Sequence, residues 1–114
     1  MSKREHKLLS LTGIELPQLS IDQLRESFKS SLDGGIHGIS FSAYEEGQKP
    51  GHQLSLEQVQ KRMSILEPSI EWVRSFSCLQ GNVLIPIVAH QQGVKTLVGA
   101  WLGDDLDKNE QEIE

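Results

Sequence analysis

The sequence predicts an α/β protein built from parallel βαβαβ units. Segments with helical periodicity alternate with segments typical of strands, in the order helix, strand, helix, strand, helix, strand and the start of another helix. The connections between them are only a few residues long. Because strands joined through a helix normally pair in parallel by right-handed crossovers, this order indicates one parallel sheet.

The first helix is predicted to begin after Ser20, which forms a capping box with Gln23. Four apolar residues recur on one face of this helix: Ile21, Leu24, Phe28 and Leu32. The run ends at Asp33-Gly34-Gly35. Residues 1–18 are polar and charged, and we expect them to be disordered or loosely packed, which leaves residues 19–114 as the folded part.

The first strand is predicted over residues 38–44, where apolar and polar residues alternate. The apolar set is Ile39, Phe41 and Ala43. Glu45 and Glu46 follow in a polar loop, which ends in the turn signal Pro50-Gly51.

A second capping box, Ser55 with Gln58, predicts the second helix, and Pro68 ends it. The apolar face of this helix comprises Leu56, Val59, Met63 and Leu66. The next strand is predicted over residues 72–77, WVRSFS, with Arg74 inside it.

Asn82 is predicted to cap the third helix, and Gly93 suits its C-terminal end. Its expected apolar set is Val83, Leu84, Ile87 and Val88. Residues 94–102 are nearly all apolar, which predicts a strand covered on both faces. Asp107 with Glu110 indicates the start of a further helix.

Composition restricts the functional classes. The chain has 114 residues and a net charge of −5, and its basic cluster Lys3, Arg4 and Lys7 is too small for a phosphate footprint, so we expect no nucleic-acid partner. The single cysteine, Cys78, excludes an internal disulfide framework. No apolar run has the length of a signal-peptide core or a membrane span. We therefore expect a soluble, cytoplasmic protein with no membrane partner.

Polar and aromatic residues gather where the predicted strands end, which is where parallel α/β folds bind ligands. Tyr44, Ser77 with Cys78, and Trp101 mark the three ends, and Arg74 lies within the second strand. Aromatic faces combined with charged and hydroxyl groups suit a polyhydroxylated ligand. The alternative is that Tyr44 and Trp101 only pack under a loop.

A guanidinium inside a strand needs a partner if it is buried. Arg74 therefore predicts either a structural ion pair with a nearby carboxylate or a direct contact with substrate, and both place it near the site.

Other chemistries lack their residues. Asp105, Asp107 and Asn109 resemble the first half of a calcium loop, but Glu110 stands where that loop needs glycine, so we expect no metal. Cys78 and His90 are expected at opposite ends of the sheet, which argues against a thiol nucleophile. No glycine-rich phosphate loop is present, and we expect no cofactor.

Three phrases at successive strand ends resemble a known family when they are read together. These are GISFSAYEEGQKPG, WVRSFS and IPIVAHQQGVKTLVGAWLGDD followed by NEQEI. In this order they resemble the N-terminal part of glycoside hydrolase family 17, in its bacterial β-1,3-glucanase-like branch. The resemblance runs from about Gly34 to the end of the chain.

The resemblance implies the first three strands of a (β/α)₈ barrel, a fold that needs about 250 residues. It also implies a retaining glycosidase or transglycosylase acting on β-1,3-glucans, with an acid and a nucleophile that in the family follow the fourth and seventh strands. No glutamate here inherits either role, so no catalytic residue is assigned and we expect the chain to be inactive alone.

The residues that the resemblance carries over to a substrate-binding role are Tyr44, Arg74 and Trp101. Phe76 stands where relatives often have tyrosine. The implied partner of the full-length parent is a β-glucan or oligosaccharide, and open strand edges create a hazard of self-association. The alternative is a small non-enzymatic α/β domain that binds a sugar-like ligand or a protein at its strand ends.

Overall fold

The computed structural model of the chain describes residues 18–114. The chain divides after Ser30 into two compact units, and the second, residues 31–114, contains the sheet. The loose lead-in expected for residues 1–18 lies outside the described residues except for Gln18. Among the described residues, no helix is both long enough and apolar enough to cross a membrane.

Helix α2 (Ile21–Asp33) begins with the predicted capping box. The Ser20 amide donates to Gln23 Oε1 at 2.9 Å, and the Gln23 amide donates to Ser20 Oγ at 3.2 Å. These two bonds satisfy amides that a helix start leaves without partners. No residue of α2 is buried.

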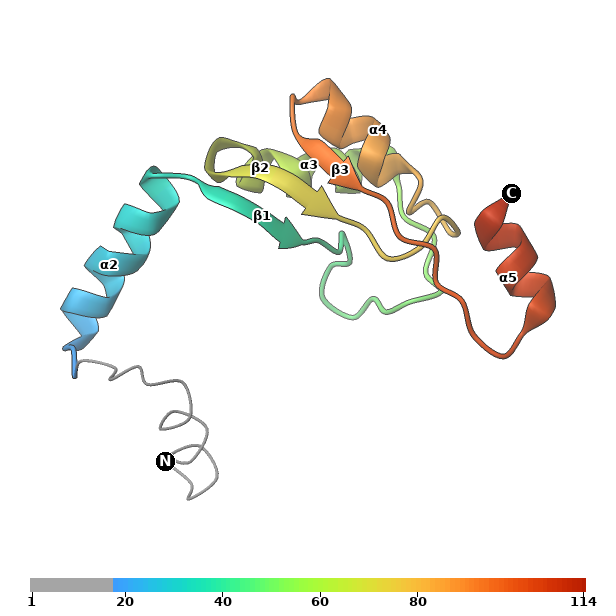
Figure 1. Cartoon of the computed structure of the whole chain (residues 1–114), viewed down its shortest axis with the longest axis horizontal. Coiled ribbons are helices and arrows are strands. Elements are labelled where there is room, and N and C mark those ends of the chain that lie inside the picture. The colour runs from blue at the N-terminus through green and yellow to red at the C-terminus, as the bar shows by residue number, and fades with distance from the viewer. Residues whose placement is uncertain (1–17) are drawn as a thin grey trace, which may run out of the picture. The chain divides into compact units, whose positions relative to one another are not determined.

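The second unit is built on a three-stranded parallel sheet in the order β1-β2-β3 (Figure 1). Its strands are β1 (Ile36–Ser40), β2 (Ile70–Arg74) and β3 (Lys95–Leu97). Val73 at the centre pairs with Ile39 on one side and Thr96 on the other. The predicted α/β class and parallel pairing are confirmed.

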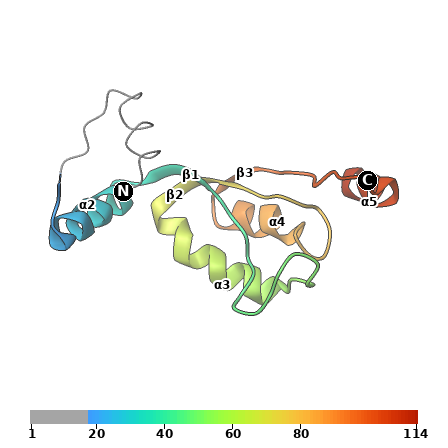
Figure 2. The same cartoon turned by 90° about the horizontal axis from the view of Figure 1, so that it is seen from below.

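Helices α3 (Leu56–Leu66) and α4 (Leu84–Gln91) cover the same face of this sheet (Figure 2). A short 3₁₀ helix, η1 (Glu67–Ser69), joins α3 to β2. Val73 faces the two helices and is 1% exposed. The core side chains that the helices contribute are Val59, Met63, Ile85, Val88 and Ala89. Within the second unit, no helix covers the opposite face of the sheet (Figure 2).

The predicted strand boundaries are partly wrong. β1 and β2 begin and end earlier than expected, although Phe41 and Ala43 beyond β1 are buried as their alternation predicted. Between β2 and β3, the regular pairing ends where the Gly99 amide bonds to the Ser75 side-chain Oγ, at 3.3 Å, and not to a backbone carbonyl.

The prediction of a long third strand covered on both faces is wrong. β3 has three residues, and Leu97, Val98 and Leu102 are at least half exposed. The physical reason is that β3 forms an edge of the described sheet, with α3 and α4 on one face only.

The predicted cap of the third helix is wrong, and its predicted apolar face is partly wrong, since Val88 is buried and Leu84 half-buried as expected. α4 begins at Leu84, and Asn82 is buried in the preceding turn, where its side-chain amide donates to the Leu79 carbonyl at 2.8 Å. Val83 and Ile87 are exposed, and the buried face is formed by Ile85, Val88 and Ala89. Gly93 ends the helix as predicted, with a φ of 78°.

The last helix, α5 (Leu106–Ile113), is longer than the single turn that the sequence indicated. Asp105 caps it by accepting a bond from the Lys108 amide at 3.2 Å. Asn109 fixes the preceding turn through two bonds to the Gly103 backbone, each 2.8 Å long. Asp105 and Asn109 thus act as cap and turn residues here.

Candidate functional site

A cleft of about 600 Å³ lies at the carboxyl ends of the strands. The loop after β1 lines it through Tyr44, the loop after β2 through Phe76 and Ser77, and the C-terminal segment through Trp101 and Glu112. Its volume falls within the range typical of small-molecule sites, about 300–1,000 Å³. The cleft therefore lies at the ends of the strands, where the sequence predicted that a ligand would bind.

The wall that carries Tyr44 is held by a side chain of α3. The Gln58 side-chain amide donates to the Ala43 carbonyl at 2.7 Å and to Gln48 Oε1 at 2.5 Å. Only one half of the predicted capping box of α3 forms: Ser55 accepts a bond from the Gln58 amide at 3.2 Å, while the Gln58 side chain turns to the loop. The Gln58 side chain thus anchors the loop after β1 to α3, and Tyr44 packs against the core beside it.

Glu45 and Glu46 belong to the same loop but do not line the cleft. The Glu45 backbone closes a turn with Gln48, since the Gln48 amide donates to the Glu45 carbonyl at 3.0 Å. The Gln48 side-chain oxygen in turn accepts from the Glu45 amide at 3.0 Å. Both glutamates lie in the loop after β1, as the sequence predicted.

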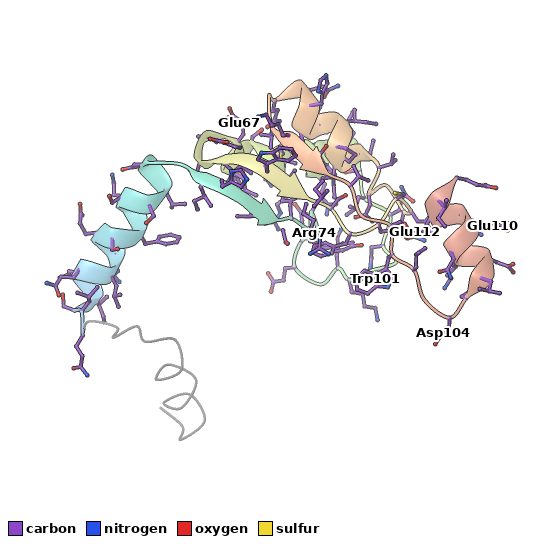
Figure 3. The ribbon with its side chains drawn as sticks, viewed as in Figure 1. Glu67, Arg74, Trp101, Asp104, Glu110 and Glu112 are labelled. Atoms are coloured by element: carbon purple, nitrogen blue, oxygen red, sulfur yellow. The ribbon has the colours of Figure 1, made fainter. Side chains whose placement is uncertain are left out.

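Arg74 lies at the end of β2, exposed and just outside the cleft (Figure 3). Its guanidinium carbon is 5.0 Å from the centre of the Phe76 ring, a cation–π arrangement. The structural ion pair that the sequence suggested is absent, because none of the ion pairs among residues 18–114 includes Arg74. The residue is exposed, so it carries no burial cost that an ion pair would offset.

The opposite wall comes from the segment after β3. Trp101 is 66% exposed and presents its ring to the cleft (Figure 3). Gly99 allows this segment to pass close to β2, because a Cβ at that position would come within 2.5 Å of the Ser75 carbonyl oxygen. Tyr44 and Trp101, two of the predicted site residues, therefore line one cleft, and Arg74 borders it through Phe76.

Glu112 is a cleft residue that the sequence reasoning missed. Its side chain is 6% exposed, and it accepts a bond from Ser77 Oγ at 2.5 Å and another from the Cys78 amide at 2.7 Å. The pattern of a carboxylate on a short helix with acidic neighbours normally predicts a solvated surface group. The available signal was weak: Glu112 shares a helical face with Lys108, which also lines the cleft.

Residues 18–114 contain no arrangement of side chains suited to metal binding or to thiol catalysis. No group of three or more His, Cys, Asp and Glu side chains is placed there to hold a metal ion. Cys78 Sγ donates to the Gly99 carbonyl at 3.7 Å, near the cleft. His90 lies in a separate, smaller hollow with Trp72 and Lys95, so these two residues do not form a nucleophile and base pair.

No family model, no curated protein and no solved structure matched this chain in the three comparisons.

Proposed function

We propose that this chain forms the first three strands of a (β/α)₈ barrel related to glycoside hydrolase family 17, in its bacterial β-1,3-glucanase-like branch. In this proposal the strand-end cleft binds part of a β-1,3-glucan chain. The observation that carries it is the cleft itself, where Tyr44 and Trp101 come from different strand ends and face one hollow.

The arrangement of the sheet supports the barrel part of the proposal. A (β/α)₈ barrel carries its helices outside and its second strand face inside. Here α3 and α4 cover one face (Figure 2), while Trp72 and Arg74 alternate with Val73 and so belong to the other. That second face would form part of the barrel interior, with Arg74 at its catalytic end.

The lining of the cleft supports a carbohydrate ligand. Aromatic rings offer flat apolar surfaces to the faces of sugar rings. The Ser77 hydroxyl oxygen and the Lys108 ammonium supply an acceptor and donors for sugar hydroxyl groups along the same walls. Phe76 contributes a ring without the hydroxyl that relatives often carry, so it stacks but does not donate a hydrogen bond.

The proposal assigns binding, and not catalysis, to the 114 residues. Retaining glycosidases use two carboxyl groups about 5 Å apart. In the proposed family these follow the fourth and seventh strands, and the chain accordingly contributes neither. The 114-residue chain is therefore expected to release no reducing sugar from a β-1,3-gluco-oligosaccharide, as followed by a reducing-end assay. Turnover that is lost in Glu45→Gln or Glu46→Gln would overturn this assignment.

The binding claim is tested by titration calorimetry with a β-1,3-linked glucose hexasaccharide and its β-1,4-linked isomer. The β-1,3 isomer is expected to bind more tightly. Trp101→Ala should weaken its binding roughly 3- to 10-fold, through loss of one stacked ring. The matched variant Trp72→Phe, which changes the tryptophan outside the cleft, should leave the affinity unchanged. Equal affinity for both isomers, or no binding, would contradict the proposal.

An alternative is a non-enzymatic α/β domain that binds a sugar-like ligand or a protein at its strand ends. One observation favours a protein partner: Leu97, Val98 and Leu102 are exposed beside the cleft on the β3 side. A monomeric chain with a sharp thermal unfolding transition would favour this alternative, because a slice of a barrel leaves hydrophobic strand edges open.

A further inference from the structure

The C-terminal helix is joined to the loop after β2 by a single buried carboxylate. Glu112 Oε1 accepts a bond from Ser77 Oγ at 2.5 Å, and Oε2 accepts one from the Cys78 amide at 2.7 Å. The bonds join positions 35 and 34 residues apart in the chain. Figure 3 places Glu112 on the side of α5 toward these loops and Glu110 on its outer side.

This carboxylate is buried without a cation. The ion pairs among residues 18–114 involve other side chains, and Lys108, one helical turn away, lies 3.9 Å from Asp105 instead. An unpaired buried carboxylate is costly unless hydrogen bonds replace its water. Both of its oxygens are bonded here, and a charge held only by directed hydrogen bonds fixes geometry more strictly than an apolar contact would.

The bonds continue from Glu112 into the cleft wall. The Ser77 hydroxyl oxygen also accepts a bond from the Leu79 amide at 3.1 Å. The Cys78 thiol donates to the carbonyl of Gly99, and Gly99 lies two residues before Trp101. Ser77, Leu79 and Trp101 all line the cleft. Glu112 therefore bonds helix α5 directly to the loop after β2, and the Cys78 thiol links that loop to the segment after β3.

We propose that Glu112 is the positioning residue of the cleft. It acts through Ser77 and the Cys78 amide to hold residues 77–80 in the conformation that forms one wall. The role of Glu112 in holding residues 77–80 does not depend on the identity of the ligand. Its expected effect on oligosaccharide affinity rests on the proposed function.

Cys78 provides a built-in probe, because it is the single cysteine of the chain and is half-buried in this loop. The test is the rate at which a chromogenic disulfide reagent modifies the thiol of the 114-residue chain. Glu112→Gln should raise this rate about tenfold, since it weakens charge-assisted hydrogen bonds that hold the loop closed. Glu110→Gln, an exposed carboxylate on the same helix, should change the rate by less than about twofold.

Removing a carboxylate also changes the charge around the thiol, so a second pair of variants keeps Glu112 in place. Ser77→Ala removes only the hydroxyl and should also accelerate modification, whereas Ser77→Thr keeps a hydroxyl and should restore the slow rate. If Glu112→Gln alone is faster, the effect is one of charge and the inference is wrong. Unchanged rates in both Glu112→Gln and Ser77→Ala would also overturn it.

The same variants are then titrated with the β-1,3-linked hexasaccharide. Weaker binding in Glu112→Gln and Ser77→Ala, with normal binding in Glu110→Gln, supports the positioning role in ligand binding. Normal affinity despite a faster thiol reaction would contradict that role. If the unaltered chain binds no oligosaccharide, the proposed function fails, while the thiol rates still decide whether Glu112 holds the wall.

Discussion

Single residues determine how closely β2 and the segment after β3 approach each other below the cleft. Gly99 passes Ser75 at a distance that leaves no room for a side chain, and its amide bonds to the Ser75 hydroxyl oxygen. Ser75 is 1% exposed, so this hydrogen bond is buried inside the protein. The contact brings Trp101, two residues further along, to the cleft edge.

Gly99→Ala is expected to destabilise the chain by about 1–3 kcal/mol, because the added methyl group meets the Ser75 carbonyl and forces the backbone to shift. Urea denaturation followed by circular dichroism measures the loss. The control is Gly103→Ala, where an added Cβ meets no atom within 4 Å. Equal stability of the two variants would show that the close approach at Gly99 has no structural role.

A simple period predicted burial correctly at some residues and wrongly at others. Phe41, Ala43, Val59 and Met63 are buried as their spacing indicated, whereas none of the apolar residues with helical spacing in α2 is buried. Glu112 could not be found in this way, because its partners Ser77 and Cys78 lie more than thirty residues earlier and no periodicity records such a pairing. The ion pair that was one of the two alternatives for Arg74 is absent, and the sequence does not reveal that this side chain stays exposed on the face without helices.

At the scale of elements, the helices with clear capping signals were predicted best. α2 and α3 begin where their capping boxes indicated. α4 lacks a side-chain cap, and its turn is built instead from Gln80 and Gly81, both with positive φ. This turn was not predicted, because a positive φ at a glutamine has no sequence signal. In the helix that follows, Ile85 is buried and Ile87 is exposed.

Ser55→Ala is expected to reduce the free energy of unfolding by about 1 kcal/mol, since it removes the bond that the Gln58 amide donates to the cap. Ser64→Ala in the same helix should change it by less than about 0.5 kcal/mol, because Ser64 is exposed and its bonds to the Gln60 carbonyl and the Gln92 side chain both lie at the protein surface. Thermal and urea unfolding compare the two. A loss at Ser64 as large as that at Ser55 would contradict the capping role.

At the scale of the whole molecule, the sheet has two edges among the described residues, β1 and β3. The strand order and parallel pairing followed from the alternation of helices and strands. The exposure of β3 could not be predicted, because an apolar run such as residues 94–102 fits a covered strand and an exposed edge strand equally well. Whether an apolar strand is covered depends on its neighbours in the folded protein, which a local sequence pattern does not describe.

We expect the 114-residue chain to self-associate through these edges. Sedimentation velocity at increasing concentration should show a rising mean mass. Leu97→Lys should shift it toward the monomer, because Leu97 is 61% exposed at the β3 edge and a charge there opposes strand pairing. Leu56→Lys changes an exposed leucine on α3 and serves as the control. A chain that stays monomeric at all concentrations would contradict the open-edge account.

The central claim is that the strand-end cleft receives a β-1,3-glucan chain, and amide and indole NMR shifts test it most directly. The two tryptophans report on separate places, Trp101 in the cleft and Trp72 in the smaller hollow near the start of β3. Titration with the β-1,3-linked hexasaccharide should move the Trp101 indole signal and the Tyr44 and Ser77 amides, and leave the Trp72 indole signal in place. Shifts centred on Trp72, or no shift at Trp101 at saturating oligosaccharide, would contradict the account.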